Sequence, residues 1–337
     1  MNNTKSILFL LAFAATTSAF SQSYVAQEIS AGGLANCLSG QVAAGSLTNH
    51  ATIWDGSGAH DVHPAGYAFS TIYGMSGSTS VGYGGISSLN QHPLIWQGAQ
   101  ATPLPVPFAY VVGKAIATDG AEVVGTASEG DAERGIGNSH VLLWNLANLS
   151  VVDLGKNMFV YGVGGGQQAG ARTGSKGTTA GFWRGTANSF TDLHVRGYSV
   201  SLCSDTDGVT QIGYLGLDVR VRNEARPRDI RFYSAVTWNG SALTVNYLSS
   251  PYRHSFATQI SGDTIVGHGN TTDAIGTPKE SRAVAWVGPN RDFVDLHALL
   301  PLDMRTSTAT GVDESGNIVG YGVTTANVVK SFVWIRQ

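Results

Sequence analysis

Charged residues, cysteines and long apolar runs are all scarce in this sequence of 337 residues. Only 13% of the residues are Asp, Glu, Lys or Arg, against roughly 25% in ordinary soluble domains. The net charge of −3 gives no general attraction to nucleic acid or to anionic membranes. No run approaches the ~20 apolar residues of a membrane-spanning helix. We therefore expect neither nucleic acid as a partner nor a membrane span.

Metal, cofactor and nucleophile motifs are also missing. The two cysteines are too few for a disulfide framework, and no Cys or His spacing is typical of a metal site. No Gly-x-Ser-x-Gly motif is present, and Gly162–Gly166 lacks the strand–helix context of a nucleotide loop. The sequence thus predicts no cofactor, no metal and no catalytic residue. Cys37 and Cys203 fall in repeats that are not neighbours, so we expect free thiols.

The N-terminal residues have the features of a secretory signal. Lys5 gives a positive start, Ile7 to Ala15 is a short apolar run, and Ala19 lies among small residues suited to cleavage. We expect 1–22 to be removed on export to the periplasm or the medium. Residues 23–337 then form one domain, which we expect to be monomeric.

Glycine is abundant, with 43 residues, and tryptophan recurs in one context. All seven tryptophans end an apolar strand-like run, and they lie 39 to 55 residues apart. Such a period is typical of propellers, solenoids and arrays. The seven are Trp54, Trp96, Trp144, Trp183, Trp238, Trp286 and Trp334.

Three further signals accompany each tryptophan. A turn and a β-branched run ending in Gly precede it, as in Gly262–Gly267 and Ser315–Gly320. A further strand-like run precedes that turn, as in Phe256–Ile260, and an Asp-Leu pair often follows the tryptophan, as in Val294–Leu296. Asp-Gly and Ser-Gly between apolar runs indicate hairpins. Four short strands per repeat indicate an all-β, seven-bladed β-propeller of four-stranded antiparallel blades. A β-solenoid and tandem sandwiches remain alternatives.

The chain ends indicate how the propeller closes. The seventh repeat stops after its third strand at Trp334, whereas Tyr24–Ile29 precedes the first repeat as an extra strand. We expect this N-terminal strand to pair into the last blade. An open solenoid would need polar capping repeats, and none is present in the sequence.

The repeat resembles that of the bacterial extracellular HAF-repeat proteins. Val294–Pro301 followed by Gly316–Gly320 carries the resemblance most clearly, and it extends over nearly the whole mature chain. The His-Ala-Phe triplet itself is absent, and the fourth and fifth repeats are degenerate. The resemblance implies an extracellular repeat protein, in a family that has no common activity.

The repeated side chains are expected to be structural. Indole rings would fill the gaps between neighbouring blades, although a ring of sugar-stacking platforms is the alternative. Asp153, Asp192 and Asp295 recur at one position and are expected to hydrogen-bond to a turn. Function is then expected in what does not repeat.

Three hairpins between the second and third strands are long, and we assign them to adjacent blades: 128–139, 215–230 and 270–280. They concentrate charge in a chain that has little of it, and loops on a rigid scaffold often bind ligands. Their cations could hold carboxylates, sulfates or phosphates, although a self-paired, solvated hairpin is the alternative. The candidate binding residues are Arg134, Arg220, Arg222, Arg226, Arg228 and Lys279.

These observations favour an exported, non-enzymatic module that binds a carbohydrate or protein partner through the loop-rich face. The first alternative is a polysaccharide hydrolase or lyase with its site at the channel mouth, where two carboxylates about 5–10 Å apart would support it. The second alternative is a structural component of the cell surface.

Overall fold

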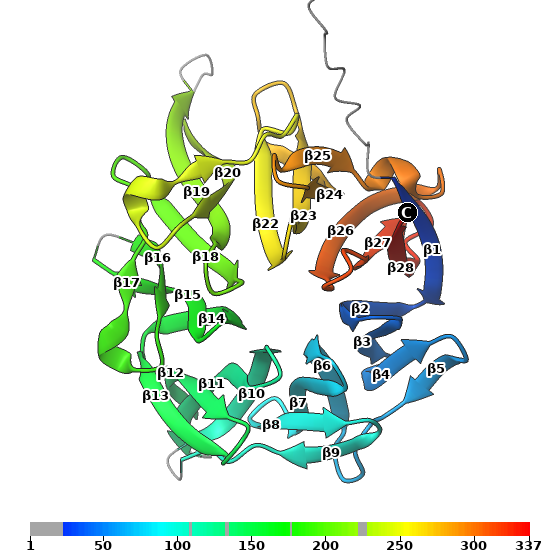
Figure 1. Cartoon of the computed structure of the whole chain (residues 1–337), viewed down its shortest axis with the longest axis vertical. Helices are drawn as coiled ribbons and strands as arrows, with labels where there is room; N and C mark the ends of the chain where they lie inside the picture. The colour runs from blue at the N-terminus through cyan, green and yellow to red at the C-terminus, as the bar shows by residue number, and fades with distance from the viewer. Residues whose placement is uncertain (1–22, 108–109, 132–134, 176, 222–227) are drawn as a thin grey trace, which may run out of the picture.

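The computed structural model describes residues 23–107, 110–131, 135–175, 177–221 and 228–337. The expected signal segment 1–22 lies outside these ranges. Strands make up almost all of the regular structure, which confirms the all-β class. The helical segments in the described ranges are the short 3₁₀ turns η1 (Ala187–Ser189), η2 (Ala242–Thr244) and η3 (His297–Leu299). Figure 1 shows the strands gathered into sheets that stand around a central axis.

The strands follow one another in antiparallel sets of four, and the first strand of each set lies nearest the axis (Figure 1). The first three sets are β2 to β5 (Gly33–Ser39, Val42–Leu47, His50–Asp55, Gly58–Asp61), β6 to β9 (Phe69–Ser76, Thr79–Ser87, Asn90–Gln97, Gln100–Pro103) and β10 to β13 (Tyr110–Thr118, Glu122–Asp131, Gly135–Asn145, Ser150–Lys156). The next three are β14 to β17 (Met158–Gly164, Gln167–Gly174, Gly177–Trp183, Thr191–Asp192), β18 to β21 (Val200–Thr206, Gln211–Val221, Arg228–Trp238, Asn246–Tyr247) and β22 to β25 (His254–Ser261, Thr264–Thr272, Pro278–Val287, Asp292–Asp295).

The last set combines strands from both ends of the chain. Its order is β26 (Met304–Val312), β27 (Ile318–Thr324), β28 (Val329–Arg336) and β1 (Tyr24–Ala31). The register of β1 on β28 runs from Tyr24 opposite Arg336 to Ala31 opposite Lys330. The N-terminal strand therefore supplies the fourth strand that the seventh repeat lacks.

The number of separate sheets differs from the expected seven. The described strands form six sheets, because β6 to β9 and β10 to β13 belong to one eight-stranded sheet. A single parallel pair, Val112 opposite Gln91, joins these two sets. Within the larger sheet each set keeps the same antiparallel order as the others.

A bulge recurs in the first strand of every set, and it explains the repeated glycine of the second strand. In β22 the register shifts between Ala257 and Gln259. A Cβ on Gly267 of β23 would overlap the carbonyl oxygen of Phe256 just before that bulge. Only glycine lets the two backbones approach this closely. The equivalent glycines, each facing a first-strand carbonyl, are Gly45, Gly82, Gly125, Gly170, Gly213 and Gly320.

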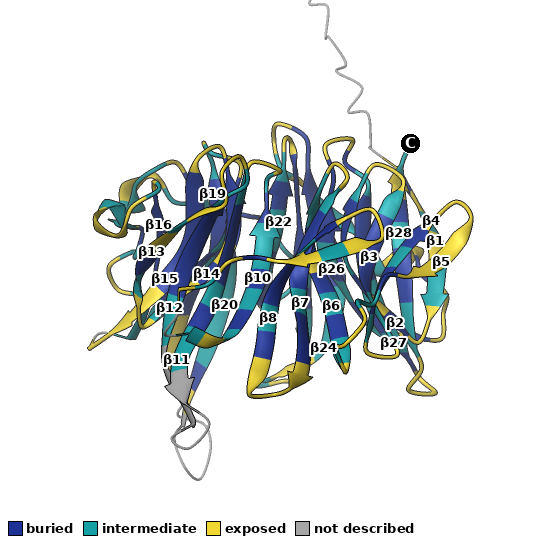
Figure 2. Cartoon of the chain, turned by 90° about the horizontal axis from the view of Figure 1, so that it is seen from below, coloured by how far each residue is buried: buried dark blue, intermediate teal, exposed yellow. Residues whose placement is uncertain are grey.

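The seven tryptophans are buried, each at most 4% exposed, and each belongs to a core cluster that spans two successive sets. Trp334, for example, packs with Val266 of β23 and with Ala283 and Ala285 of β24. The cores thus lie between successive sets, and Figure 2 shows that many strand residues are buried. Burying an indole removes roughly 150–250 Å² from water, so these clusters hold neighbouring sets together.

Candidate functional site

The long hairpins do not form one continuous surface of adjacent sets, contrary to the expectation from sequence. They join β11 to β12, β19 to β20 and β23 to β24, and the set β14 to β17 separates the first from the other two. The expectation was wrong because the hairpins belong to the third, fifth and sixth sets.

Three cations in or beside these hairpins are paired with carboxylates of the same strand pair. Arg220 lies 3.6 Å from Asp229, and Lys279 lies 3.7 Å from Asp273. Arg231 donates two hydrogen bonds to Asp218, at 2.7 and 3.0 Å. In the β19–β20 register Asp218 stands opposite Arg231, and Arg220 opposite Asp229. The self-paired interpretation therefore fits these residues. Of the other candidates, Arg134, Arg222 and Arg226 lie outside the described residues, and Arg228 begins β20.

The repeated aspartates of the outer strands bind turn backbone, as expected for a structural role. Asp192 accepts the N–H of His194, and Asp295 accepts that of Ala298. Asp153 accepts the N–H of Gly155 in the same way. Among the described residues these carboxylates thus serve the turns that follow each outer strand.

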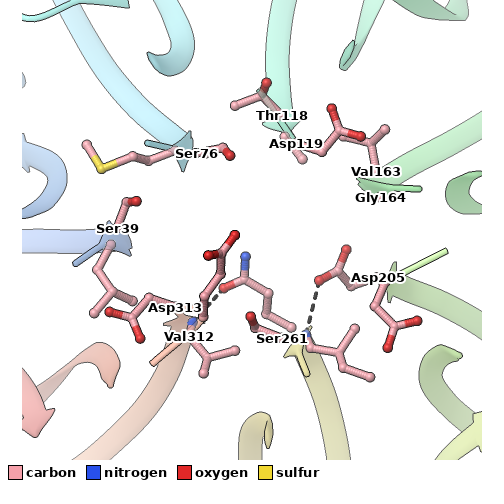
Figure 3. A pocket seen from close by; sticks show the side chains of 18 of the residues that line it. Ser39, Ser76, Thr118, Asp119, Val163, Gly164, Asp205, Ser261, Val312 and Asp313 are labelled. Carbon is pink, nitrogen blue, oxygen red and sulfur yellow. Dashed lines mark hydrogen bonds between the residues drawn. The ribbon is translucent and has the colours of Figure 1, made fainter. Parts of the chain in front are cut away.

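A cavity of about 630 Å³ lies on the axis, where the turns after the first strands meet. All seven sets line it through the ends of β2, β6, β10, β14, β18, β22 and β26. Figure 3 looks into this axial pocket, with Ser39, Ser76, Asp119, Asp205 and Asp313 disposed around it. The preferred sequence prediction placed function at the other end of the strands, on the hairpins between second and third strands, and the channel mouth was predicted only as the site of the alternative hydrolase or lyase.

The lining of the axial pocket is acidic. Five carboxylates line it, and the lining residues include no Lys, Arg or His. Three of the five carboxylates also fix the local turn: Asp119, Asp207 and Asp313 each accept two backbone N–H groups through Oδ1. The remaining two are Asp205 and Glu314.

Asp205 differs from its counterparts after the bulges of other sets, which are mostly small residues such as Gly162 and Gly311. Its side chain is buried, with 7% of the residue exposed. Its Oδ2 accepts the N–H of Ile260, 3.1 Å away, and a Cβ on Gly162 would overlap its Oδ1. Asp205 thus touches the sets before and after its own. Burial raises the pKa of this carboxyl to about 7, against the lowering effect of its backbone hydrogen bonds.

Aromatic and hydroxyl groups complete the pocket. Tyr73 and Tyr161 occupy the bulge position of β6 and β14 and remain 38% and 39% exposed. At the same position Ser204 and Thr258 instead donate to carbonyls of the following set, Ala257 and Ala309. The pocket therefore has an aromatic side at β6 and β14 and a hydrogen-bonded side at β18 and β22. Ionised carboxylates with tyrosine rings favour a cation.

Metal binding has no support from the described part of the chain. No group of three or more His, Cys, Asp or Glu side chains is placed there to hold an ion. Within the same ranges, no helix has the length and apolar character needed to cross a membrane.

Comparison with known proteins gives likenesses of fold. No protein-family model and no curated protein matches the chain. Among solved structures, the β-propeller domain of the Trilobed protease from Pyrococcus furiosus is similar at 9% identity and a TM-score of 0.47, covering 80% of this chain and 95% of that one. The N-terminal domain of Nup159 is similar at 11% identity and a TM-score of 0.41, and the match covers 94% of this chain and 96% of that one. The polysaccharide lyase Uly1 is similar at 8% identity and a TM-score of 0.38, and the match covers 67% of this chain and 58% of that one. All three TM-scores are below 0.5.

Proposed function

We propose that this protein is an exported, non-enzymatic binding module with seven blades, closed by the pairing of β1 with β28. The seven first-strand bulges and the seven segments around the axial pocket support this count, with the eight-stranded sheet taken as two blades. The signal-like segment and the resemblance to extracellular HAF-repeat proteins support export.

The ligand that fits the axial pocket is a positively charged segment of a partner protein. The observation that carries this proposal is a cavity of about 630 Å³ lined by five carboxylates and no cationic side chain. The half-exposed rings of Tyr73 and Tyr161 add faces on which a Lys or Arg side chain packs favourably. A concave site with few, convergent polar groups is the usual form of a binding site.

The long hairpins fit a ligand less well than the axial pocket does. The cations Arg220, Arg231 and Lys279 already have carboxylate partners. An anionic ligand there would have to displace those partners. Among the described residues, the five carboxylates that line the axial pocket form no ion pair, so a cation there gains attraction without displacing a partner.

Fluorescence anisotropy with a labelled Lys- and Arg-rich decapeptide tests the proposal. The double variant Asp207→Asn with Glu314→Gln removes two charges and keeps an oxygen to accept the turn hydrogen bonds of position 207. We expect the dissociation constant to rise about tenfold, since each exposed charge contributes up to ~1 kcal/mol. Binding by the unaltered protein should weaken as salt is added.

The matched control removes two charges from the hairpins, as Asp229→Asn with Glu280→Gln, and should leave peptide affinity unchanged. A peptide whose Lys and Arg are replaced by Gln should not bind. Equal loss of affinity in both double variants, or equal binding of the neutral peptide, contradicts the assignment to the axial pocket.

A second candidate, a polysaccharide hydrolase or lyase, is favoured by one observation. Asp205 has a pKa of about 7 beside other carboxylates, and a protonated and an ionised carboxyl are the pair that glycoside hydrolysis uses. Release of reducing ends from a polysaccharide panel, abolished in Asp205→Asn, would support this function over the binding module. No release by the unaltered protein would remove it.

Export is tested separately by fractionating producing cells and sequencing the N-terminus of the protein. We expect a chain that begins near residue 23 in the periplasm or the medium. A cytoplasmic chain that retains residues 1–22 would contradict export, whatever the peptide measurements show.

A further inference from the structure

A second cavity opens beside the axial pocket, at the same end of the strands. It has a volume of about 980 Å³ and lies between the β8–β9 turn on one side and the β10–β11 and β12–β13 turns on the other. We call it the side pocket. Its lining consists of amide, hydroxyl and apolar side chains together with Gly120, and it includes no Asp, Glu, Lys, Arg or His. The side pocket is therefore neutral, whereas the axial pocket is acidic.

The two pockets share the turns that separate them. At the β6–β7 turn, Ser76 lines the axial pocket and Thr79 the side pocket; at the β10–β11 turn, Asp119 lines the axial pocket and Gly120 the side pocket. The two turns are in contact, because a Cβ on Gly120 would lie 3.2 Å from Ser76 Oγ. Figure 3 shows Ser76 and Asp119 on the same side of the axial pocket. Since consecutive Cα atoms are about 3.8 Å apart, the step from Asp119 to Gly120 leads from one pocket into the other.

Carboxamides provide most of the polar side chains of the side pocket. Asn145 and Asn148 use Oδ1 to accept backbone N–H groups of their own turn. Gln97 and Gln100 stand opposite each other across the β8–β9 turn. Both are exposed, and neither side chain has a partner within the described ranges. Because a carboxamide both donates and accepts hydrogen bonds, the two glutamines can bond to the N–H and C=O groups of an extended peptide.

Apolar side chains lie beside these carboxamides. Leu149 is 50% exposed in the β12–β13 turn, and Ile95 and Leu146 are partly buried. A charged group that entered this pocket would lose hydration without gaining an ionised partner from the lining. The side pocket therefore favours uncharged residues, whereas the axial pocket next to it favours a cation.

We propose that the two pockets bind one continuous segment of a partner protein, with Lys or Arg residues on the axis and an adjoining extended, uncharged stretch in the side pocket. The carboxamides of Gln97 and Gln100 hold the backbone of that stretch, and Leu149 packs against its side chains. This inference rests on the proposed function, which assigns only the cationic part, and adds the chemistry of the residues that adjoin it.

Two labelled peptides with blocked termini test the inference by fluorescence anisotropy. The short one is Lys-Arg-Lys-Arg, and the long one carries the same four residues between two flanks of six Thr, Gln and Leu residues. Each flank extends about 20 Å, and flanks on both ends allow for either chain direction. Because the flanks carry no charge, the attraction to the axial carboxylates is the same for both peptides.

We expect the dissociation constant of the long peptide to be about tenfold lower, for two hydrogen bonds and the apolar contact with Leu149. Equal constants for the two peptides overturn the inference and leave the proposed function standing. Binding of neither peptide contradicts the proposed function, and the inference with it.

A double variant locates the added affinity. Gln97→Ala with Gln100→Ala removes two exposed carboxamides and leaves the core intact. We expect the long peptide to lose most of its advantage, and the short peptide to keep its affinity, since neither glutamine lines the axial pocket. The matched control, Gln27→Ala with Gln337→Ala, removes two exposed glutamines that line neither pocket and should keep the full advantage. An undiminished advantage in the first variant, or an equal loss in both, contradicts the assignment to the side pocket.

Discussion

The Asp205 carboxylate of β18 accepts a hydrogen bond from the backbone N–H of Ile260 in β22, with Oδ2 and N 3.1 Å apart. This contact joins two successive sets at the axis through a buried acid. Because burial raises the pKa of Asp205 to about 7, its protonation couples the stability of the ring to pH.

Asp205 should make the protein less stable as pH rises from about 4 to 7. In this range the unfolded chain has released the proton of Asp205, whereas the folded chain still holds it, so raising the pH favours the unfolded state. Urea unfolding at several pH values should show this slope. Asp205→Asn keeps an acceptor for Ile260 and should remove a contribution of about 1–4 kcal/mol; an unchanged slope in the variant would contradict the assignment.

Gly267→Ala should destabilise the protein strongly. Its Cβ would overlap the carbonyl oxygen of Phe256, so β22 and β23 would have to separate at the bulge. We expect a loss of about 3 kcal/mol or more, measured by chemical denaturation. Gly56→Ala is the control, since nothing lies within 4 Å of the added methyl. Similar losses in the two variants would rule out close strand approach as the reason for the repeated glycine.

Trp334→Phe should cost more stability than Trp183→Phe. Both residues are fully buried in a core between two successive sets. Of this pair, only the Trp334 indole donates a hydrogen bond, so its replacement leaves the Leu296 carbonyl oxygen without that donor. We expect a difference of about 1–2 kcal/mol in unfolding free energy. A larger loss for Trp183→Phe would show that packing, rather than the hydrogen bond, sets the difference.

Cys37 and Cys203 should not react with thiol reagents in the folded protein. Both are buried, unbonded thiols, and burial raises the pKa of each far above the usual range. With a chromogenic disulfide reagent at pH 8, we expect no release in native buffer and two equivalents after denaturation. Prompt reaction without denaturant would show that the cores between successive sets, where the two thiols lie, open readily.

The strands and turns were predictable because their signals are local. The Gly of each first turn, such as Gly262 and Gly316, has a positive φ, and the run before it alternates as a strand requires. The partner of Tyr24–Ala31 followed from the missing strand at Trp334. The merged sheet was not predictable, since one residue pair, Val112 and Gln91, creates it.

The sequence pointed to the channel mouth only as the site of the alternative hydrolase or lyase, and it did not identify which carboxylates line it, because Asp119, Asp207 and Asp313 are typical of turn residues. Their convergence depends on the arrangement of seven distant turns about one axis. Asp205 gave a usable signal, since most other sets place a small residue after the bulge. The self-paired hairpin was one of the two interpretations drawn from the sequence, and the structure adds its register, in which Asp218 stands opposite Arg231.

The pairing of β1 with β28 also sets an order of events during synthesis. Tyr24–Ala31 leaves the ribosome among the first strands, yet its partner Val329–Arg336 follows some 300 residues later in the sequence. Contacts of such long range form slowly. A chain translocated N-terminus first would therefore expose an unsatisfied strand edge until translation is nearly complete, and a chaperone that recognises extended segments would have that whole interval in which to act.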